Sequence, residues 1–124
     1  MMTKKGLSLI DSQDAIIGNP LYDVASLIDD VRLKTSNSLK EEMFNHFTKK
    51  YLNRDLKKFK NDFLILSVLR NFKILGIFSR LAKRDDKNKY LKYIPYTWSL
   101  IKLRTKNGKV FDELRFILNN NKFI

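Results

Sequence analysis

Apolar residues recur at helical spacing over most of the chain beyond its first eighteen residues, which predicts a mainly helical protein. A first helix is predicted over residues 19–34, because Asn19 supplies a cap and Pro20 suits a first helical turn. A second begins at Ser38, where Ser-Leu-Lys-Glu forms a capping box. The longest, over residues 56–84, has apolar residues on more than one side and is expected to be the central, most buried element. In the first two helices the positions expected to face inward are Leu21, Val24, Ala25, Leu27, Ile28 and Val31, then Leu39, Met43, Phe44, Phe47 and Tyr51.

The C-terminal third continues as helix. Residues 89–105 are expected to be helical, with a kink or a restart at Pro95. Asn107-Gly108 predicts a turn before a last short helix over residues 110–118. Trp98 lies at core spacing, and we interpret it as a packing residue.

The N-terminal end differs. Leu7 and Leu9 alternate with polar neighbours, which predicts a strand over residues 6–10, followed by a loop. The expected fold class is therefore mainly α, with a short N-terminal strand or strands followed by about five helices. We expect a single domain over residues 1–124, with the strand and loop in 1–18 and helices in 19–124.

Composition excludes several kinds of chemistry. The absence of cysteine removes disulfides, thiol catalysis and zinc–thiolate sites. A single histidine makes His-based metal sites and Ser-His-Asp catalysis poor hypotheses, and this residue, His46, lies in a predicted helix and is expected to be a surface or packing residue. The net charge of +12 is unevenly placed, because the first thirty residues carry −3 and the remainder +15. The acidic N-terminal segment is therefore expected to have a role of its own.

The basic remainder allows an alternative hypothesis, a small helical nucleic-acid-binding protein. Its support is the lysine-rich runs at 49–50, 57–60 and 83–84. However, lysine outnumbers arginine 18 to 7, no recognition motif is present, and Phe59 and Phe63 lie at core spacing. We interpret these runs as solvated helix faces and do not expect a nucleic-acid partner.

No membrane segment is predicted. The longest apolar stretch, residues 63–82, is interrupted by Arg70, Asn71, Lys73 and Arg80, so it is expected to be a buried helix. The expected location is the cytoplasm.

The densest chemistry lies in residues 9–30. Asp11 follows the predicted strand and Asp14 comes three residues later, and carboxylate oxygens are ligands that Mg²⁺ prefers. Asp23 falls in the first turn of a helix, where the dipole favours an acid. Spacing alone equally allows a turn aspartate at 11 and a simple helix-terminus acid at 23.

The sequence Leu-Ile-Asp-Ser-Gln-Asp-Ala at 9–15, followed by Gly-Asn-Pro-Leu-Tyr-Asp-Val-Ala-Ser-Leu at 18–27, resembles the metal-binding segment of the aminoglycoside/choline phosphotransferase-like kinases. The Gln-Asp-Ala and Tyr-Asp-x-x-Ser-Leu elements look most like the bacterial branch that phosphorylates N-acetylmuramate and N-acetylglucosamine, which residues 70–81 and 89–91 also resemble. The resemblance covers about residues 7–95. The chain departs from it at Ser12, where a bulky aromatic residue is common, and at Asn19, where Asp is common.

The resemblance implies roles for three carboxylates. Asp11, with possible help from Asp14, would bind the Mg²⁺ that bridges nucleotide phosphates, and Asp23 would be the family's buried aspartate that braces the catalytic loop. It also implies that the complete enzyme uses Mg²⁺, ATP and an amino sugar or similar small hydroxyl compound. We expect neither ion nor nucleotide to bind tightly to this chain alone.

The other catalytic parts of such a kinase are not found in this sequence. It contains no phosphate loop, no nucleotide lysine on a strand and no His-x-Asp-x-x-x-x-Asn catalytic loop. We therefore expect the helical C-lobe portion of a protein-kinase-like fold, which follows a missing N-terminal half, contains no catalytic base and is inactive alone. A non-catalytic partner of a separately encoded N-terminal half is the other interpretation. Substrate residues stay open, and the polar side chains expected to border the cleft are Tyr22, Arg70, Asn71, Lys73 and Arg80.

Overall fold

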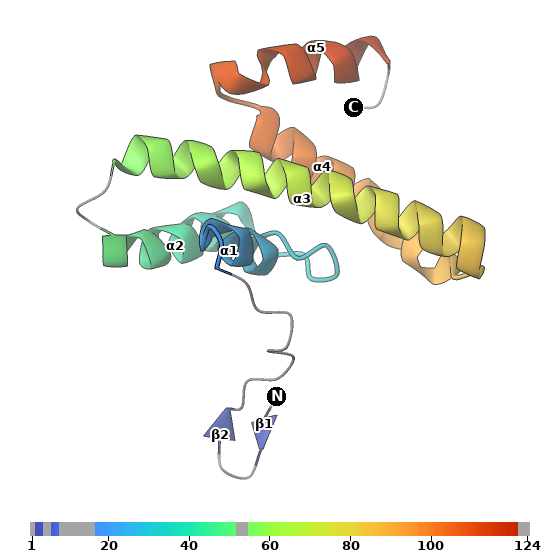
Figure 1. Ribbon diagram of the computed structural model, residues 1–124, viewed down its shortest axis with the longest axis horizontal. Coiled ribbons are helices and arrows are strands. Elements are labelled where there is room, and N and C mark those ends of the chain that lie inside the picture. The colour runs from blue at the N-terminus through green and yellow to red at the C-terminus, as the bar shows by residue number, and fades with distance from the viewer. Residues whose placement is uncertain (1, 4–5, 8–16, 52–54, 122–124) are drawn as a thin grey trace.

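The computed structural model describes residues 2–3, 6–7, 17–51 and 55–121, and this part of the chain is mainly helical, as predicted (Figure 1). Two short strands, β1 (Met2–Thr3) and β2 (Gly6–Leu7), pair antiparallel, with Met2 opposite Leu7. β2 falls within the predicted strand, residues 6–10, whose remainder lies outside the described residues, so that strand stays a prediction. The helical elements are α1 (Leu21–Ile28), α2 (Asn37–Thr48), α3 (Leu56–Asp85), α4 (Ile94–Thr105) and α5 (Asp112–Asn120), with short 3₁₀ helices η1 (Lys49–Tyr51), η2 (Asn88–Tyr93) and η3 (Lys109–Phe111).

The long helix α3 is the central element, and its predicted bounds were wrong by only one residue. It begins where Asp55 accepts hydrogen bonds from the backbone N–H groups of Lys57 (3.0 Å) and Lys58 (3.1 Å). It ends at Asp85, and the next residue, Asp86, adopts the left-handed conformation. Helices α1 and α4 both pack against it (Figure 1). A helix with neighbours on two sides needs apolar residues on more than one face, which explains its broad apolar pattern.

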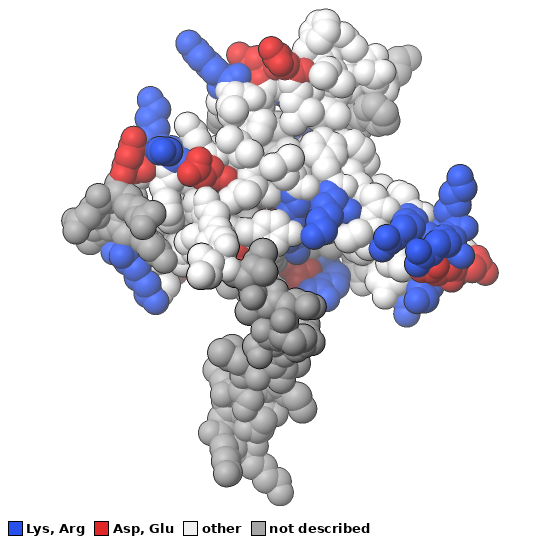
Figure 2. Space-filling view, in the orientation of Figure 1, with Lys and Arg blue, Asp and Glu red and all other residues white. Residues whose placement is uncertain are grey.

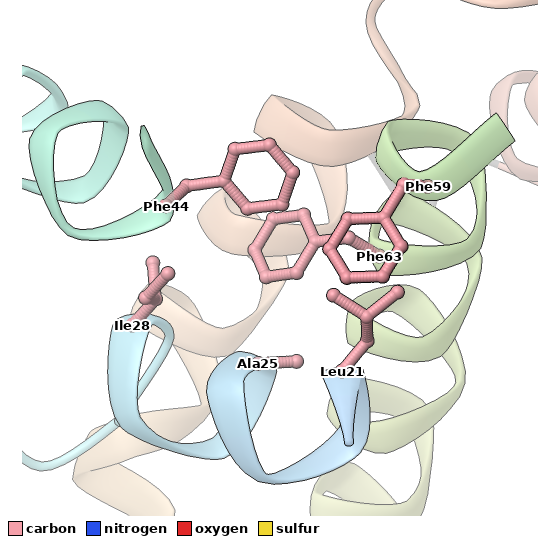
Figure 3. Packing of buried hydrophobic residues seen from close by; sticks show 6 residues of the cluster. All are labelled: Leu21, Ala25, Ile28, Phe44, Phe59 and Phe63. Carbon is pink, nitrogen blue, oxygen red and sulfur yellow. The ribbon is translucent and has the colours of Figure 1, made fainter. Parts of the chain in front are cut away.

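The first core cluster joins α1, α2 and the beginning of α3. Figure 3 shows the side chains from the three helices meeting, and the rings of Phe44 and Phe63 lie 4.7 Å apart between centroids. The buried members are Leu21, Ala25, Ile28, Phe44, Phe59 and Phe63. Two of the positions predicted to face inward do not: Leu27 is 69% exposed and Leu39 is 42% exposed. Leu27 lies one residue before the buried Ile28, on the side of this short helix that faces away from the core.

The second cluster lies where α4 and η2 pack on the C-terminal half of α3. Its buried members are Val31, Phe78 and Leu100, and the ring of Phe78 stacks on that of Tyr90 at 5.5 Å. Trp98 is half-buried and meets the ring of Phe72 edge-on at 5.9 Å, which agrees with a packing role.

The predicted end of the first helix and the predicted start of the second were wrong. The first helix ends at Ile28 instead of continuing to residue 34, because the next residue, Asp29, turns into the interior and binds buried cations there. The second helix is capped by Ser36 instead of Ser38: the extended backbone of Ser36 lets its hydroxyl accept a hydrogen bond from the N–H of Leu39 at 3.2 Å. Ser38 already lies inside the helix.

In the C-terminal third, the predicted helix over residues 89–105 is divided into η2 and α4, and the last helix covers Asp112–Asn120 where 110–118 was predicted. Pro95 occupies the first turn of α4, so the chain restarts there after η2. Gly108 has a φ of 115°, a value that favours glycine, in the turn before η3 and α5. In the described part of the chain no helix combines the length and the apolar character needed to cross a membrane.

Candidate functional site

A groove of about 800 Å³ lies between the start of α1 and the middle of α3. It combines apolar side chains with one carboxylate and two cationic groups. Its lining residues are Ile17, Gly18, Asn19, Pro20, Tyr22, Asp23, Leu66, Leu69, Arg70 and Lys73. We call it the α1–α3 groove.

The first turn of α1 sets one wall of the α1–α3 groove. The side chain of Asn19 accepts a hydrogen bond from the N–H of Leu21 at 3.0 Å, and its backbone carbonyl accepts from the N–H of Tyr22, also at 3.0 Å. The Asn19 side chain thus binds a free amide at the helix start, as predicted, whereas Pro20, predicted in the first helical position, lies just before the helix, which begins at Leu21. Because Leu21 is anchored in the core, Tyr22 and Asp23 point outward at the groove.

Asp23 is exposed on this wall. Within the described residues its carboxylate forms no side-chain hydrogen bond and no ion pair. The resemblance implied a buried aspartate that holds a catalytic loop, and the described chain contains no such loop against it. Its bracing role therefore stays a prediction, and the described residues leave it exposed.

The opposite wall carries Arg70 and Lys73, one helical turn apart on α3. Arg70 is half-buried and donates from Nη1 to the backbone carbonyl of Asp29 at 3.1 Å. Burial lowers the pKa of Arg70, an effect only partly offset by the nearby Tyr22 and Asp30. Lys73 is exposed, and its Nζ lies 3.5 Å from the Tyr22 hydroxyl and 5.9 Å from the centre of that ring.

Of the five polar residues expected to border a cleft, the structure brings three together. Tyr22, Arg70 and Lys73 line the α1–α3 groove. The other two residues, Asn71 and Arg80, do not line this groove. Asn71 is fully buried on the inner side of α3, and Arg80 lines a separate shallow hollow near the end of that helix.

The predicted metal ligands Asp11 and Asp14 lie outside the described residues. Their assignment to Mg²⁺ stays a prediction. Among the residues that are described, no three His, Cys, Asp or Glu side chains come together as a metal site.

Directly behind the groove is a buried ionic cluster that sequence reasoning missed. Its centre is the carboxylate of Asp29, which is fully buried at the end of α1. Arg104 of α4 donates to both carboxylate oxygens, from Nε and Nη2, each at 2.8 Å, and the Ser67 hydroxyl of α3 donates at 2.6 Å. Lys40 of α2 places its Nζ 3.3 Å from the same carboxylate and 2.6 Å from the carbonyl oxygen of Ile28. One carboxylate at the end of α1 thus joins this helix to α2, α3 and α4.

Electrostatics keep this carboxylate ionised. Burial raises the pKa of Asp29, but the hydrogen bonds and charge of Arg104, the Ser67 hydroxyl and the charge of Lys40 together outweigh burial, so the pKa lies below its ordinary value. The guanidinium of Arg104 also lies over the Phe63 ring, 5.0 Å from its centre. Because Arg70 binds the backbone carbonyl of the same aspartate, the cluster positions a groove residue as well.

A second hollow, about 750 Å³, lies between α1 and α2 and is largely apolar, with Val24, Leu27, Met43 and Phe47 in its walls. His46 is exposed at its edge, which agrees with the expected helix-surface role.

The basic residues form no continuous patch on the face shown in Figure 2. They stand in separate groups, with acidic side chains beside some of them (Figure 2). Near the end of α3, for example, Arg84 pairs with Asp85 at 2.6 Å. This distribution does not favour the nucleic-acid alternative.

Comparison with known proteins gives a specific result. No family model matches the chain. Three curated relatives are each named N-acetylmuramate/N-acetylglucosamine kinase. The protein from Caulobacter vibrioides is 30% identical over 92 residues, which is 74% of this chain and 25% of the relative. Those from Pseudomonas aeruginosa and Neisseria meningitidis serogroup B are each 31% identical over 101 residues, which is 77% of this chain and 30% of each relative.

The chain is related to kinases. It spans about a quarter to a third of the length of these relatives. The matches agree with the bacterial branch named by the resemblance, but they do not show the wider aminoglycoside/choline phosphotransferase family.

Proposed function

We propose that this chain is the helical C-lobe portion of an ATP-dependent kinase that transfers a phosphoryl group to a hydroxyl of an amino sugar or a similar small molecule. The observation that carries the proposal is the 30% identity over 92 residues to the Caulobacter vibrioides N-acetylmuramate/N-acetylglucosamine kinase. The match covers only a quarter of that enzyme, so the remaining catalytic parts would lie outside the matched residues. We expect no phosphorylation by this chain alone. A cytoplasmic location belongs to the same proposal, because ATP is the donor.

In this proposal Asp11, with Asp14, holds Mg²⁺. Two carboxylates are the oxygen donors this ion accepts alongside nucleotide phosphates, so the donor set fits it. The ion supplies positive charge that neutralises the transferring phosphoryl group. Asp23 faces open solvent at the α1–α3 groove, which leaves its carboxylate available to a loop supplied by the remaining part of the enzyme.

A chimera tests the proposal. This chain would replace the matching segment of the Caulobacter vibrioides kinase, and ADP release would be measured with N-acetylglucosamine and ATP. We expect sugar-dependent ADP release. The Asp11→Asn variant of the chimera should lose about a hundredfold in kcat or more, because a metal ion contributes several kcal/mol of charge stabilisation.

The matched control is Glu42→Gln, which removes another carboxylate, exposed on α2, and should leave the rate unchanged. Circular dichroism and a single cooperative melting transition would show that each chimera is folded. A folded chimera without sugar-dependent activity would contradict the proposed function, and equal rates for the Asp11→Asn and control variants would contradict the metal assignment.

A further inference from the structure

The end of α3 and the short helix that follows it carry a concentration of positive charge. Residues 80–92 contain six basic and two acidic side chains. Figure 1 shows that α3 and η2 meet at one end of the molecule, and basic side chains gather at this end in Figure 2. We call residues 80–92 the basic corner. Its basic residues are all exposed: Arg80, Lys83, Arg84, Lys87, Lys89 and Lys92.

The fold holds the two parts of the basic corner together. Asp86 reverses the chain in the left-handed conformation after α3 ends. The ring of Phe78 then lies 5.5 Å from that of Tyr90 and 5.8 Å from that of Tyr93, between centroids, so η2 packs back against α3. The cations of the helix and those of η2 therefore belong to one surface.

Little of this positive charge is neutralised by neighbouring acids. Arg84 pairs with Asp85 at 2.6 Å, and Asp86 accepts a hydrogen bond from the side-chain amide of Asn88 at 3.0 Å. Among the described residues, no further salt bridge involves the basic corner. The remaining cations are therefore available to an anionic surface outside the chain.

An apolar side chain is exposed among these charges. Leu91, in η2, is 41% exposed. The ammonium groups of the lysines on either side of it, Lys89 and Lys92, lie 5.4 Å and 5.1 Å from the ring centres of Tyr90 and Tyr93. Basic side chains around an exposed leucine and tyrosine rings are typical of surfaces that bind the interface of an anionic bilayer.

A bilayer fits the basic corner better than a nucleic acid does. Proteins bind single strands with aromatic faces on which bases stack, but the rings of Tyr90 and Tyr93 already pack against Phe78. A phosphate backbone alone gives no partner to the exposed Leu91, whereas the acyl boundary of a bilayer does.

We propose that the basic corner attaches this protein reversibly to the surface of a membrane that contains anionic lipids. Its lysines and arginines would lie at the lipid phosphates, and Leu91 would enter the interface. The α1–α3 groove has none of these residues in its walls, so attachment leaves the groove free. The proposal concerns where the protein binds and is independent of the proposed phosphoryl transfer.

Vesicle flotation with the full chain tests the proposal. Vesicles of phosphatidylcholine alone are compared with vesicles in which about a third of the lipid is phosphatidylglycerol. At low ionic strength we expect the chain to float only with the anionic vesicles, and added salt to release it because the attraction is screened. Flotation is preferred to sedimentation because a self-associated chain sediments without vesicles but does not float.

A triple variant, Lys83→Gln with Lys87→Gln and Lys89→Gln, removes half of the basic residues of the corner. We expect its partition coefficient onto anionic vesicles to fall about a hundredfold, because each basic residue near such a surface contributes about fivefold. Leu91→Gln should lower the partition coefficient about fivefold, since less apolar surface enters the interface.

The matched control is Lys50→Gln with Lys57→Gln and Lys58→Gln, which has the same net charge as the triple variant. These lysines are exposed in η1 and at the beginning of α3, away from the basic corner. The control should bind anionic vesicles within about threefold of the parent, and circular dichroism should show the same helical content in every variant.

Three results would overturn the proposal. One is the absence of flotation with anionic vesicles at low ionic strength. Another is an equal loss in the two triple variants, which would show that net charge alone drives binding. The third is a short DNA duplex that binds the chain more tightly than the vesicles do and displaces it from them, which would assign the basic corner to nucleic acid.

Discussion

At the scale of single residues, the neighbours Asp29 and Asp30 have opposite environments. Asp29 is fully buried among Arg104, Ser67 and Lys40, whereas Asp30 pairs with Arg32, whose side chain is 70% exposed. Asp29→Asn leaves two buried cations uncompensated, so we expect it to lower the free energy of unfolding by about 3–5 kcal/mol. Asp30→Asn is the control and should cost about 1 kcal/mol or less.

Urea unfolding as a function of pH measures both variants. The folded-state pKa of Asp29 is lowered, so its contribution to stability is fully present above the ordinary aspartate pKa, near 3.8, and is lost as the pH falls through the lower folded-state value. The Asp29→Asn protein should therefore lose less stability than the parent in that acidic range. If it does not fold, Ser67→Ala, which removes only the hydroxyl donor, is the milder test. A cost for Asp29→Asn as small as that of the control would show that the ionic cluster does not hold the helices together.

At the scale of elements, the sequence pattern and the structure place the cap of α2 at different residues. The capping-box pattern favours Ser38, but the observed cap hydrogen bond comes from Ser36. We expect Ser36→Ala to lower the free energy of unfolding by about 1 kcal/mol and Ser38→Ala to have little effect. Urea unfolding by linear extrapolation gives both values, and the reverse order would place the cap at Ser38.

The same comparison shows which elements sequence can define. Helix α3 was predicted well because its apolar pattern is long and Asp55 caps it locally. The end of α1 was not, because Asp29 binds Arg104, which lies 75 residues away in the sequence, and no local pattern contains that contact. A signal did exist: Lys40 lies one turn before the buried Phe44, on the apolar side of α2, where a charged residue indicates a buried partner.

The candidate site was predictable to a similar extent. The helix start at Asn19 follows from local chemistry, and Tyr22 follows from its place in that first turn. The meeting of Arg70 and Lys73 with Tyr22 depends on how α1 packs on α3, which joins residues about fifty positions apart. Sequence could nominate these side chains, but it could not separate them from Arg80 on the same helix, which lines a different hollow.

At the scale of the whole molecule, the described structure leaves several apolar side chains in solvent. At the α1–α3 groove, Ile17 is fully exposed and Leu69 is 60% exposed. Leu27 is 69% exposed at the hollow between α1 and α2, and Phe116 is 68% exposed on α5. Three separate parts of the surface thus present large apolar groups, an arrangement typical of surfaces that associate. In the proposed function, the first of these would face the remaining part of the kinase.

We therefore predict that the isolated chain self-associates. Size-exclusion chromatography with light scattering should give a mass that rises with concentration above the 14.7 kDa of one chain. Leu69→Gln combined with Leu27→Gln should shift the distribution toward the monomer, because burial of each leucine contributes about 1.5–3 kcal/mol to association. Leu33→Gln is the control: Leu33 is 65% exposed but lies between the charged Arg32 and Lys34 and lines neither hollow, so its replacement should leave the distribution unchanged. A parent chain that remains a monomer at every concentration would show that these exposed apolar faces do not drive self-association.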